Sequence, residues 1–249
     1  GWRSTYDGSI SGNGREMISK PSNGDILHHR ILALEDWAKF YDVYVNRSCG
    51  LHVHFDATDT SWKDLRGIAI VMHKVEQHLF KMLPPSRTTS NWCRKVSMPF
   101  KRLVQCSSQS EFVQLWYDGY NINRDKYNDS RYHGLNLHAR FYLGTIEFRY
   151  HSATLNYNKI SNWIKLCNSV IETGLQLSRN DKFKHRTFYL KTRDDSFASP
   201  QVKLGDLLCR MKHLDRNVVE YMMSRMGKFQ PQDEIFTDVA HSIDLNKIK

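Results

Sequence analysis

The segment Gly-Leu-His-Val-His-Phe-Asp at residues 50–56 alternates strictly between apolar and ionisable side chains. Because successive side chains of a β-strand point to opposite faces, His52, His54 and Asp56 would share one face of a strand. A face exposed only to solvent would normally carry Lys, Thr, Ser and Glu. Imidazole and carboxylate groups bind metal ions, so this segment is a candidate for the floor of an active site.

A second segment, residues 145–151, has the same pattern, with Glu147, Arg149 and His151 on its polar face. A carboxylate can bind a divalent cation, and the guanidinium fork of arginine binds phosphate oxygens in a bidentate manner. Either pattern alone is more often structural, as hydrogen-bonded histidines or a surface ion pair. Together they favour a divalent cation beside a polyphosphate, and we predict that both strands lie in one sheet with their polar faces turned the same way.

A third alternating segment, residues 135–141, would place Asn136, His138 and Arg140 on its polar face. Gly144 stands between this segment and the strand that begins at residue 145, which predicts a hairpin. Residues 14–19 predict a further short strand that carries Glu16, a residue that would by itself be interpreted as a surface carboxylate.

The remaining pattern is mainly helical. Apolar residues at helical spacing predict long helices, with Ser22–Asp25 and Ser61–Asp64 resembling capping boxes before the first two. These helices cover residues 27–45, 65–82 and 160–175; a short helix is expected at 111–117, irregular chain at 84–109 and 179–199, and a helical region at about 200–226 that begins at Ser199-Pro200. We therefore predict an α+β fold: a mainly antiparallel sheet, helices over its apolar face, and an open polar face. Residues 1–178 would form this domain, with 179–249 as a helical extension packed on it.

Composition restricts the class of protein only loosely. The chain has 249 residues, 40% hydrophobic and 25% charged, with a net charge of +10 that suits an anionic ligand. Trp92 and Trp116 near basic residues also allow a nucleic-acid-binding protein, but such aromatic residues are more often core residues, so nucleic acid is not the expected partner. Five cysteines without a CxxC spacing indicate reduced thiols in the cytoplasm, and no apolar run is long enough for a membrane span.

Five short motifs follow one another along the first two-thirds of the chain. They are Asp-Gly-Ser-Ile at 7–10, Gly-x-Glu-Met-Ile-Ser-x-Pro at 14–21, Cys-Gly-Leu-His-Val-His at 49–54, Arg-Tyr-x-x-Leu-Asn-Leu at 131–137, and Thr-Ile-Glu-Phe-Arg-x-His-x-x-Thr-Leu at 145–155. In order and spacing they resemble the putative amidoligase family, over about residues 2–175. That family belongs to the carboxylate-amine ligases related to glutamine synthetase and glutamate–cysteine ligase.

The resemblance implies a glutamine-synthetase-like catalytic domain and an ATP-dependent ligase. ATP would phosphorylate a carboxylate, and an amine would attack the acyl phosphate to form an amide, with two or three Mg²⁺ ions between the nucleotide and the sheet. Small-molecule or peptide carboxylates and amines would be the substrates, and an oligomer or larger assembly is compatible with this reaction.

The resemblance also implies a role for single residues. Matched by motif, Glu147 and His52 would bind one metal ion and Glu16 another. Arg149 would bind the transferring phosphate, with His54 nearby on phosphate or substrate. Further candidates for binding the cofactor or positioning the substrate are Arg131, Asn136 and His151.

Other functions remain open at this point. In this family a strand with two acidic residues normally precedes the Asp-Gly-Ser segment, whereas here Asp7 is the first acidic residue. We therefore expect that strand upstream of Gly1, a replacement from another segment or subunit, or a degenerate site. A degenerate protein would serve as a binding or structural component, for example in a virus particle. A mononuclear zinc hydrolase built on His52, His54 and Asp56 is a further alternative.

Overall fold

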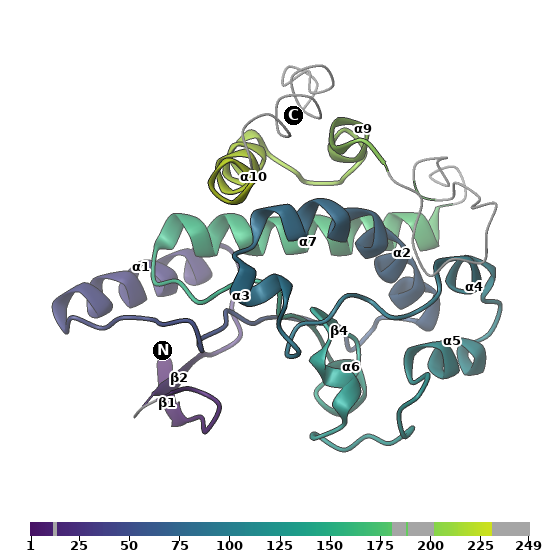
Figure 1. The fold of residues 1–249 in the computed structure, drawn as a ribbon, viewed down its shortest axis with the longest axis horizontal. Helices are drawn as coiled ribbons and strands as arrows, with labels where there is room; N and C mark the ends of the chain where they lie inside the picture. The colour runs from purple at the N-terminus through teal and green to yellow at the C-terminus, as the bar shows by residue number, and fades with distance from the viewer. Residues whose placement is uncertain (12–13, 181–187, 189–201, 231–249) are drawn as a thin grey trace.

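The computed structural model describes residues 1–11, 14–180, 188 and 202–230. Within these residues the fold is α+β, as predicted, with two small antiparallel sheets and longer helices (Figure 1). The elements in chain order are β1 (Trp2–Tyr6), β2 (Arg15–Ser19), α1 (Gly24–Phe40), β3 (Val53–Asp56), α2 (Trp62–Leu79), η1 (Phe80–Met82), α3 (Pro85–Thr88), α4 (Phe100–Gln105), α5 (Gln109–Trp116), η2 (Asp129–Tyr132), β4 (Leu135–Asn136), α6 (Ala139–Tyr142), β5 (Thr145–Phe148), α7 (Tyr157–Arg179), α9 (Leu204–Leu208) and α10 (Arg216–Phe229).

The three-stranded sheet has the order β3-β5-β4, with β5 antiparallel to both neighbours. This arrangement confirms that the strands predicted at residues 51–56 and 145–151 pair. β4 and β5 also pair, but α6 lies between them, so the connection is not the tight hairpin predicted at Gly144. The apolar side chains of β5, Ile146 and Phe148, are buried in the core that α2 and α7 also line. The opposite face of the sheet therefore carries the polar side chains.

The strand predicted over residues 135–141 is shorter than expected. β4 ends at Asn136, whose side-chain oxygen accepts a hydrogen bond from the backbone N–H of Ala139 at 3.2 Å and so turns the chain into α6. His138 and Arg140 consequently leave the sheet. His138 hydrogen-bonds a tyrosine hydroxyl at 2.6 Å, and Arg140 donates to a backbone carbonyl at 2.8 Å.

The first helix differs from its prediction at both ends. α1 begins at Gly24 after Asn23, whose side chain makes no capping hydrogen bond, so the predicted Ser22–Asp25 capping box is wrong. The hydroxyl of Ser22 instead donates to the carbonyl of Lys20. The helix ends at Phe40, short of the predicted residue 45.

Two further regions differ from their predictions: one predicted as irregular chain contains short helices, and one predicted as a single helical region is divided in two. Residues 84–109 include the short helices α3 and α4, single turns too brief to produce a periodic pattern. The helical region predicted at about 200–226 is divided into α9 and α10, because Asp215 starts a new helix by accepting a hydrogen bond from the N–H of Val218 at 2.9 Å. Its predicted start at Ser199-Pro200 lies outside the described residues.

The longest helices, α2 and α7, pack against each other through two glycines. A Cβ atom at Gly174 would lie 2.5 Å from the Cα of Ile68, and one at Gly67 would meet the carbonyl of Gly174. Real Cβ atoms do not approach other backbone atoms so closely, so neither position accepts a side chain without moving a helix. The two backbones therefore touch at this point.

The capping box predicted at Ser61–Asp64 is confirmed, and its carboxylate does more than cap. The carboxylate of Asp64 accepts hydrogen bonds from the hydroxyl and N–H of Ser61. It also accepts hydrogen bonds from Ser178 and Arg179, in the last turn of α7. Burial alone would raise the pKa of Asp64, but these hydrogen bonds outweigh it and lower the pKa to about 2. Asp64 thus joins the first turn of α2 to the last turn of α7.

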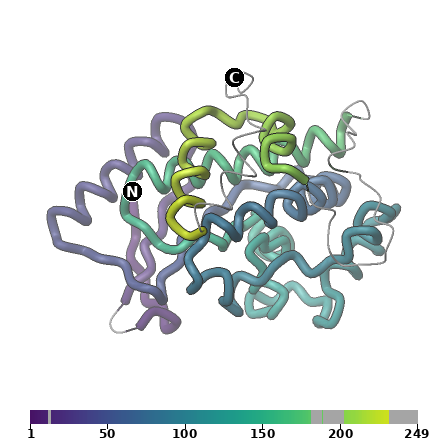
Figure 2. Tube along the Cα trace, turned by 45° about the horizontal axis from the view of Figure 1, so that its top comes forward, coloured from purple at the N-terminus to yellow at the C-terminus, as the bar shows by residue number. Residues whose placement is uncertain are grey.

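The elements form layers around α7, which spans the middle of the molecule (Figure 1). α9 and α10 lie on one side, and α10 runs across α7 (Figures 1 and 2). The sheet and α6 lie on the other side, and the β1–β2 hairpin lies beside α1, against which Trp2 and Met17 pack. The division into a domain of residues 1–178 and an extension stays a prediction, although Val218 and Met222 of α10 belong to the same core as α2 and α7. None of the described helices is long and apolar enough to cross a membrane.

Candidate active site

Glu147 is the centre of a cluster of polar side chains on the sheet. Its side chain is only 4% exposed. Its Oε1 atom lies 3.3 Å from Nδ1 of His52 and 3.5 Å from Nε2 of His54. The same oxygen accepts a hydrogen bond from Arg149 at 2.8 Å, while Oε2 accepts one from the side-chain amide of Asn136 at 2.6 Å. A single buried carboxylate thus contacts four of the predicted site residues.

The strand register explains why these residues meet. Glu147 stands directly opposite His54 on β3 and Asn136 on β4. Directly opposed residues of antiparallel strands place their side chains on the same face, with Cβ atoms about 5 Å apart. His52 precedes β3 and has the same parity as His54. The prediction that the two polar faces turn the same way is therefore confirmed.

The cluster holds Glu147 as an anion. Burial would raise its pKa, but the hydrogen bond with His54 and the charge of Arg149 outweigh burial and hold the pKa well below its usual range. His52 shows the opposite effect. Burial and then the charge of Arg149 lower its pKa to about 4, despite the attraction of Glu147. At neutral pH His52 is therefore an uncharged imidazole, the form that can bind a metal ion.

Glu16 approaches the same cluster from the β1–β2 hairpin. Burial raises its pKa, and the negative charges of Asp7 and Glu147 raise it further, against the opposing charges of His54 and Arg149. These influences show that three carboxylates share one electrostatic environment. Glu16, which the sequence alone would assign to the surface, therefore lies within electrostatic reach of the Glu147 cluster.

Asp7 is a second hairpin carboxylate within electrostatic reach of the cluster, and sequence reasoning gave it no role. It lies in the loop between β1 and β2 and accepts hydrogen bonds from the N–H and hydroxyl of Ser9 at 2.8 and 2.7 Å. Burial raises its pKa, but these bonds, together with the charge of Arg149, outweigh burial, so the pKa is lowered. The signal that could have identified Asp7 is the Asp-Gly-Ser motif itself, which also predicts the turn.

The chemistry of these groups fits a divalent cation. Carboxylate oxygens are the ligands that Mg²⁺ prefers. Burial is the main cause of the raised pKa of Glu16, and the negative charges of Asp7 and Glu147 raise it further, a repulsion that a cation would relieve. Within the described part of the chain, no three His, Cys, Asp or Glu side chains are grouped closely enough to hold an ion as they stand. Arg149 and the two histidines occupy the Oε1 side of Glu147 instead.

Two predicted residues lie away from Glu147. His151 is buried, and its ring bonds the hydroxyl of Tyr221 at 2.6 Å and contacts Trp163, so it points toward α7 and α10. The reason is that β5 ends at Phe148, and the alternation ends with it. Arg131 lies on η2, with its guanidinium over two tyrosine rings and donating to a backbone carbonyl at 3.1 Å.

Asp56 does not act together with the two histidines. Its carboxylate accepts hydrogen bonds from the N–H and hydroxyl of Thr58, at 3.0 and 2.6 Å, and so shapes the turn after β3. These bonds lower its pKa. The structure thus offers no support for a zinc site made of His52, His54 and Asp56.

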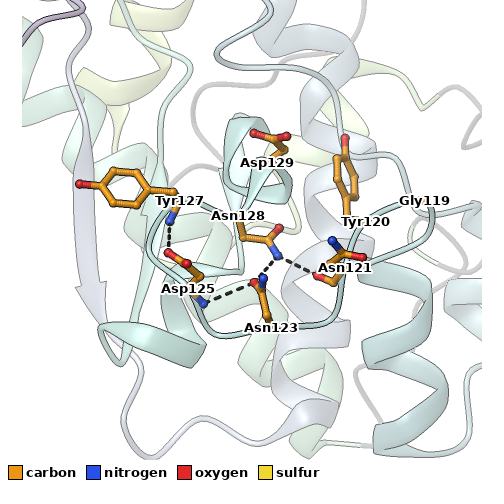
Figure 3. Close-up of a pocket in the computed structure, with 8 residues that line it drawn as sticks. All are labelled: Gly119, Tyr120, Asn121, Asn123, Asp125, Tyr127, Asn128 and Asp129. Carbon is orange, nitrogen blue, oxygen red and sulfur yellow. Dashed lines mark hydrogen bonds between the residues drawn. The ribbon is translucent and has the colours of Figure 1, made fainter.

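A polar pocket of about 300 Å³ lies in the loop between α5 and η2 (Figure 3). Its side chains mainly bond one another. Asn128 donates to the carbonyl of Asn121 and to the side chain of Asn123, both at 2.7 Å, and the N–H of Tyr127 donates to Asp125 at 2.9 Å. None of the predicted site residues lines this pocket.

The fold and the site define an α+β protein whose sheet presents carboxylate, imidazole and guanidinium groups on one face. Residues 16–171 match the family described as putative amidoligase enzyme, and the chain belongs to that family. Membership of this family indicates a ligase. The match includes Glu16 and the Glu147 cluster, whereas Asp7 precedes it. Comparison with curated proteins and with solved structures found no match to the chain.

Proposed function

We propose that this protein is an ATP- and Mg²⁺-dependent carboxylate–amine ligase with a glutamine-synthetase-like catalytic sheet. The observation that carries the proposal is the convergence of Glu147, His52, His54 and Arg149 on one face, with Glu16 in the same electrostatic environment. An ordinary surface ion pair needs neither two imidazoles nor a second carboxylate.

The exposure of the side chains suggests how the roles are divided. Glu147 is buried and anionic, and with Glu16 and Asp7 it would hold Mg²⁺, which neutralises the charge of nucleotide phosphates. Arg149 is 15% exposed, so part of its guanidinium remains open to a phosphate. His54 is 38% exposed and is assigned to the substrate side of the site.

The reaction would proceed in two steps. A carboxylate oxygen of the first substrate attacks the γ-phosphorus of ATP, and ADP leaves. The amine nitrogen of the second substrate then attacks the acyl carbon, phosphate leaves, and the nitrogen loses a proton. Neither step needs a protein nucleophile, because phosphoryl transfer depends mainly on alignment and charge neutralisation. Small-molecule or peptide carboxylates and amines are the proposed substrates.

The test compares ADP release by the wild type and by Arg149→Ala, with ATP, Mg²⁺ and panels of carboxylates and amines. We expect about a 100-fold or larger loss in the variant, the size of effect seen when a charge-stabilising donor is removed. Arg140→Ala is the matched control, because Arg140 lies in α6, between β4 and β5, and donates to the carbonyl of Thr58 rather than to Glu147. Equal turnover by wild type and Arg149→Ala would overturn the assignment.

A further inference from the structure

Arg87 is a buried arginine whose side chain bonds the backbone directly after β5. It lies in α3 and is only 6% exposed. Its Nε donates to the carbonyl of Tyr150 at 3.1 Å, and its Nη2 donates to the carbonyl of Arg149. Because β5 ends at Phe148, the sheet ladder does not extend to these two carbonyls. Arg87 therefore takes the place of a neighbouring strand at the point where Arg149 leaves the sheet.

The guanidinium of Arg87 also lies close to Gly50, in the segment that leads into β3. A Cβ atom at Gly50 would stand 3.4 Å from Nη1 of Arg87 and 3.0 Å from Nε2 of His52. The side chains of Arg87 and His52 therefore occupy the space beside Gly50 that a larger residue would need. Arg87 thus touches the segment that enters β3 and the segment that leaves β5.

Arg87 bonds these groups without an acidic partner among the described residues. No described carboxylate forms an ion pair with it. Burial lowers its pKa, and the nearby charge of Arg149 lowers it further. Burying a guanidinium lowers stability unless its N–H groups form hydrogen bonds, and here the two backbone carbonyls accept them.

We propose that Arg87 is a positioning residue, which holds the Arg149–Tyr150 backbone so that the Arg149 guanidinium faces the transferring phosphate. The inference rests on the proposed function but adds a residue outside the Glu147 cluster. Arg87 does not touch substrate. Its planar fork reaches two consecutive carbonyls, a geometry that the single ammonium group of lysine does not reproduce.

The first test is hydrogen exchange in the full chain, which needs no activity. The N–H of Arg149 bonds the carbonyl of Gly134 at 2.7 Å, and the N–H of Leu51 bonds that of His151 at 3.0 Å. In Arg87→Lys and Arg87→Ala we expect these two amides to exchange about tenfold faster or more, with amides of α7 unchanged.

Arg30 provides the matched control for this exchange test. Its Nη1 donates to two consecutive carbonyls, those of Lys20 at 2.7 Å and Pro21 at 3.1 Å, but at the hairpin. Arg30→Lys should leave the amides of Leu51 and Arg149 unchanged.

The second test is kinetic. If Arg87 orients Arg149, we expect kcat to fall about 100-fold in Arg87→Ala, because misplacement of a catalytic group by about 1 Å has this effect. The KM for ATP should stay within about threefold, added guanidinium ion should restore part of kcat, and Arg87→Lys should remain impaired.

The outcomes separate the two proposals. Unchanged exchange at Leu51 and Arg149 in Arg87→Lys, or an unchanged kcat in that variant, would overturn the positioning role. If Arg87→Ala does not fold, the lysine variant still decides the question. Absence of ATP-dependent turnover in the wild type would remove the ligase assignment and the catalytic part of this inference, while exchange would still decide whether Arg87 holds the Arg149 backbone.

Discussion

Two buried carboxylates, Glu147 in the sheet and Asp64 at the start of α2, have the same electrostatic signature and different surroundings. Each has an arginine partner and a lowered pKa. Asp64 bonds two hydroxyls and Arg179, groups that end helices and hold them together. Glu147 contacts two imidazoles and Arg149, groups that can bind metal and phosphate.

A lowered pKa therefore does not by itself mark a functional residue. Structural ion pairs and active sites both perturb titration, so the partners must decide. The partners of Asp64 come from two helix ends. Those of Glu147 come from β3, β4 and the residues next to β3 and β5, and the hairpin brings Glu16 and Asp7 within electrostatic reach. Substitutions in the two regions should therefore affect different measurements.

The largest effect is expected for Glu147→Gln. Under the proposed function, removing the anion while keeping the shape should lower ATP-dependent turnover by about 1000-fold and abolish thermal stabilisation by ATP and Mg²⁺, because the proposed cation would lose its central ligand. Steady-state kinetics and thermal shift assays would measure both. Turnover within about threefold of wild type would mean that Glu147, like Asp64, is structural.

Gly174→Ala should cause the largest loss of stability. The new methyl group would overlap the backbone of Ile68, so we expect the free energy of unfolding to fall by about 3 kcal/mol, measured by denaturant titration. Gly227→Ala in α10 is the control, because nothing lies within 4 Å of its Cβ position, and it should stabilise the helix by about 0.5 to 1 kcal/mol. Equal effects would show that α2 and α7 do not touch at this point.

Glu76 is a third buried carboxyl, on α2, and its pKa moves the other way. Burial raises the pKa to about 7, despite hydrogen bonds from the hydroxyl of Tyr150 at 2.8 Å and the N–H of Val96 at 3.0 Å. Its protonated form therefore favours folding below the usual pKa of 4.5, and that contribution is lost as the pH rises through about 7.

Relative to Glu76→Gln, the wild type should lose about 2 kcal/mol of stability between pH 5 and pH 8. Parallel denaturant titrations of both proteins across that range would measure the difference. A constant difference would show that the carboxyl of Glu76 keeps its ordinary pKa, as a hydrated carboxyl would.

The smallest effect is expected for Asp64→Asn. We expect a loss of about 1 to 2 kcal/mol at pH 7, which denaturant titration would measure, with kcat unchanged. Since the pKa of Asp64 falls from 3.8 to about 2, its contribution is present above pH 3.8 and is lost as the pH falls through about 2.

Lys165→Ala, which breaks an exposed ion pair with Asp215, is the control for Asp64 and should cost about 0.5 kcal/mol or less. A drop in kcat in Asp64→Asn would contradict the division between a structural and a functional carboxylate.

Local patterns predicted much of this protein. Alternation identified the strands that carry His54 and Glu147, apolar spacing identified α2 and α7, and Ser61 with Asp64 marked the start of α2. These features depend on neighbours within one strand or one helical turn, which the sequence states directly. The choice of Glu147 and Arg149 as a pair also needed no more than their spacing.

The groups that approach this pair from distant parts of the chain depend on long-range packing. Packing brings Glu16 and Asp7 of the hairpin within electrostatic reach of the cluster. It also turns His151 toward α10 and lets Arg87 bond the carbonyl of Arg149. Each outcome depends on contacts between segments far apart in the chain and on where β5 ends. Residue spacing cannot encode such contacts, because packing and burial, rather than local geometry, set their free energy.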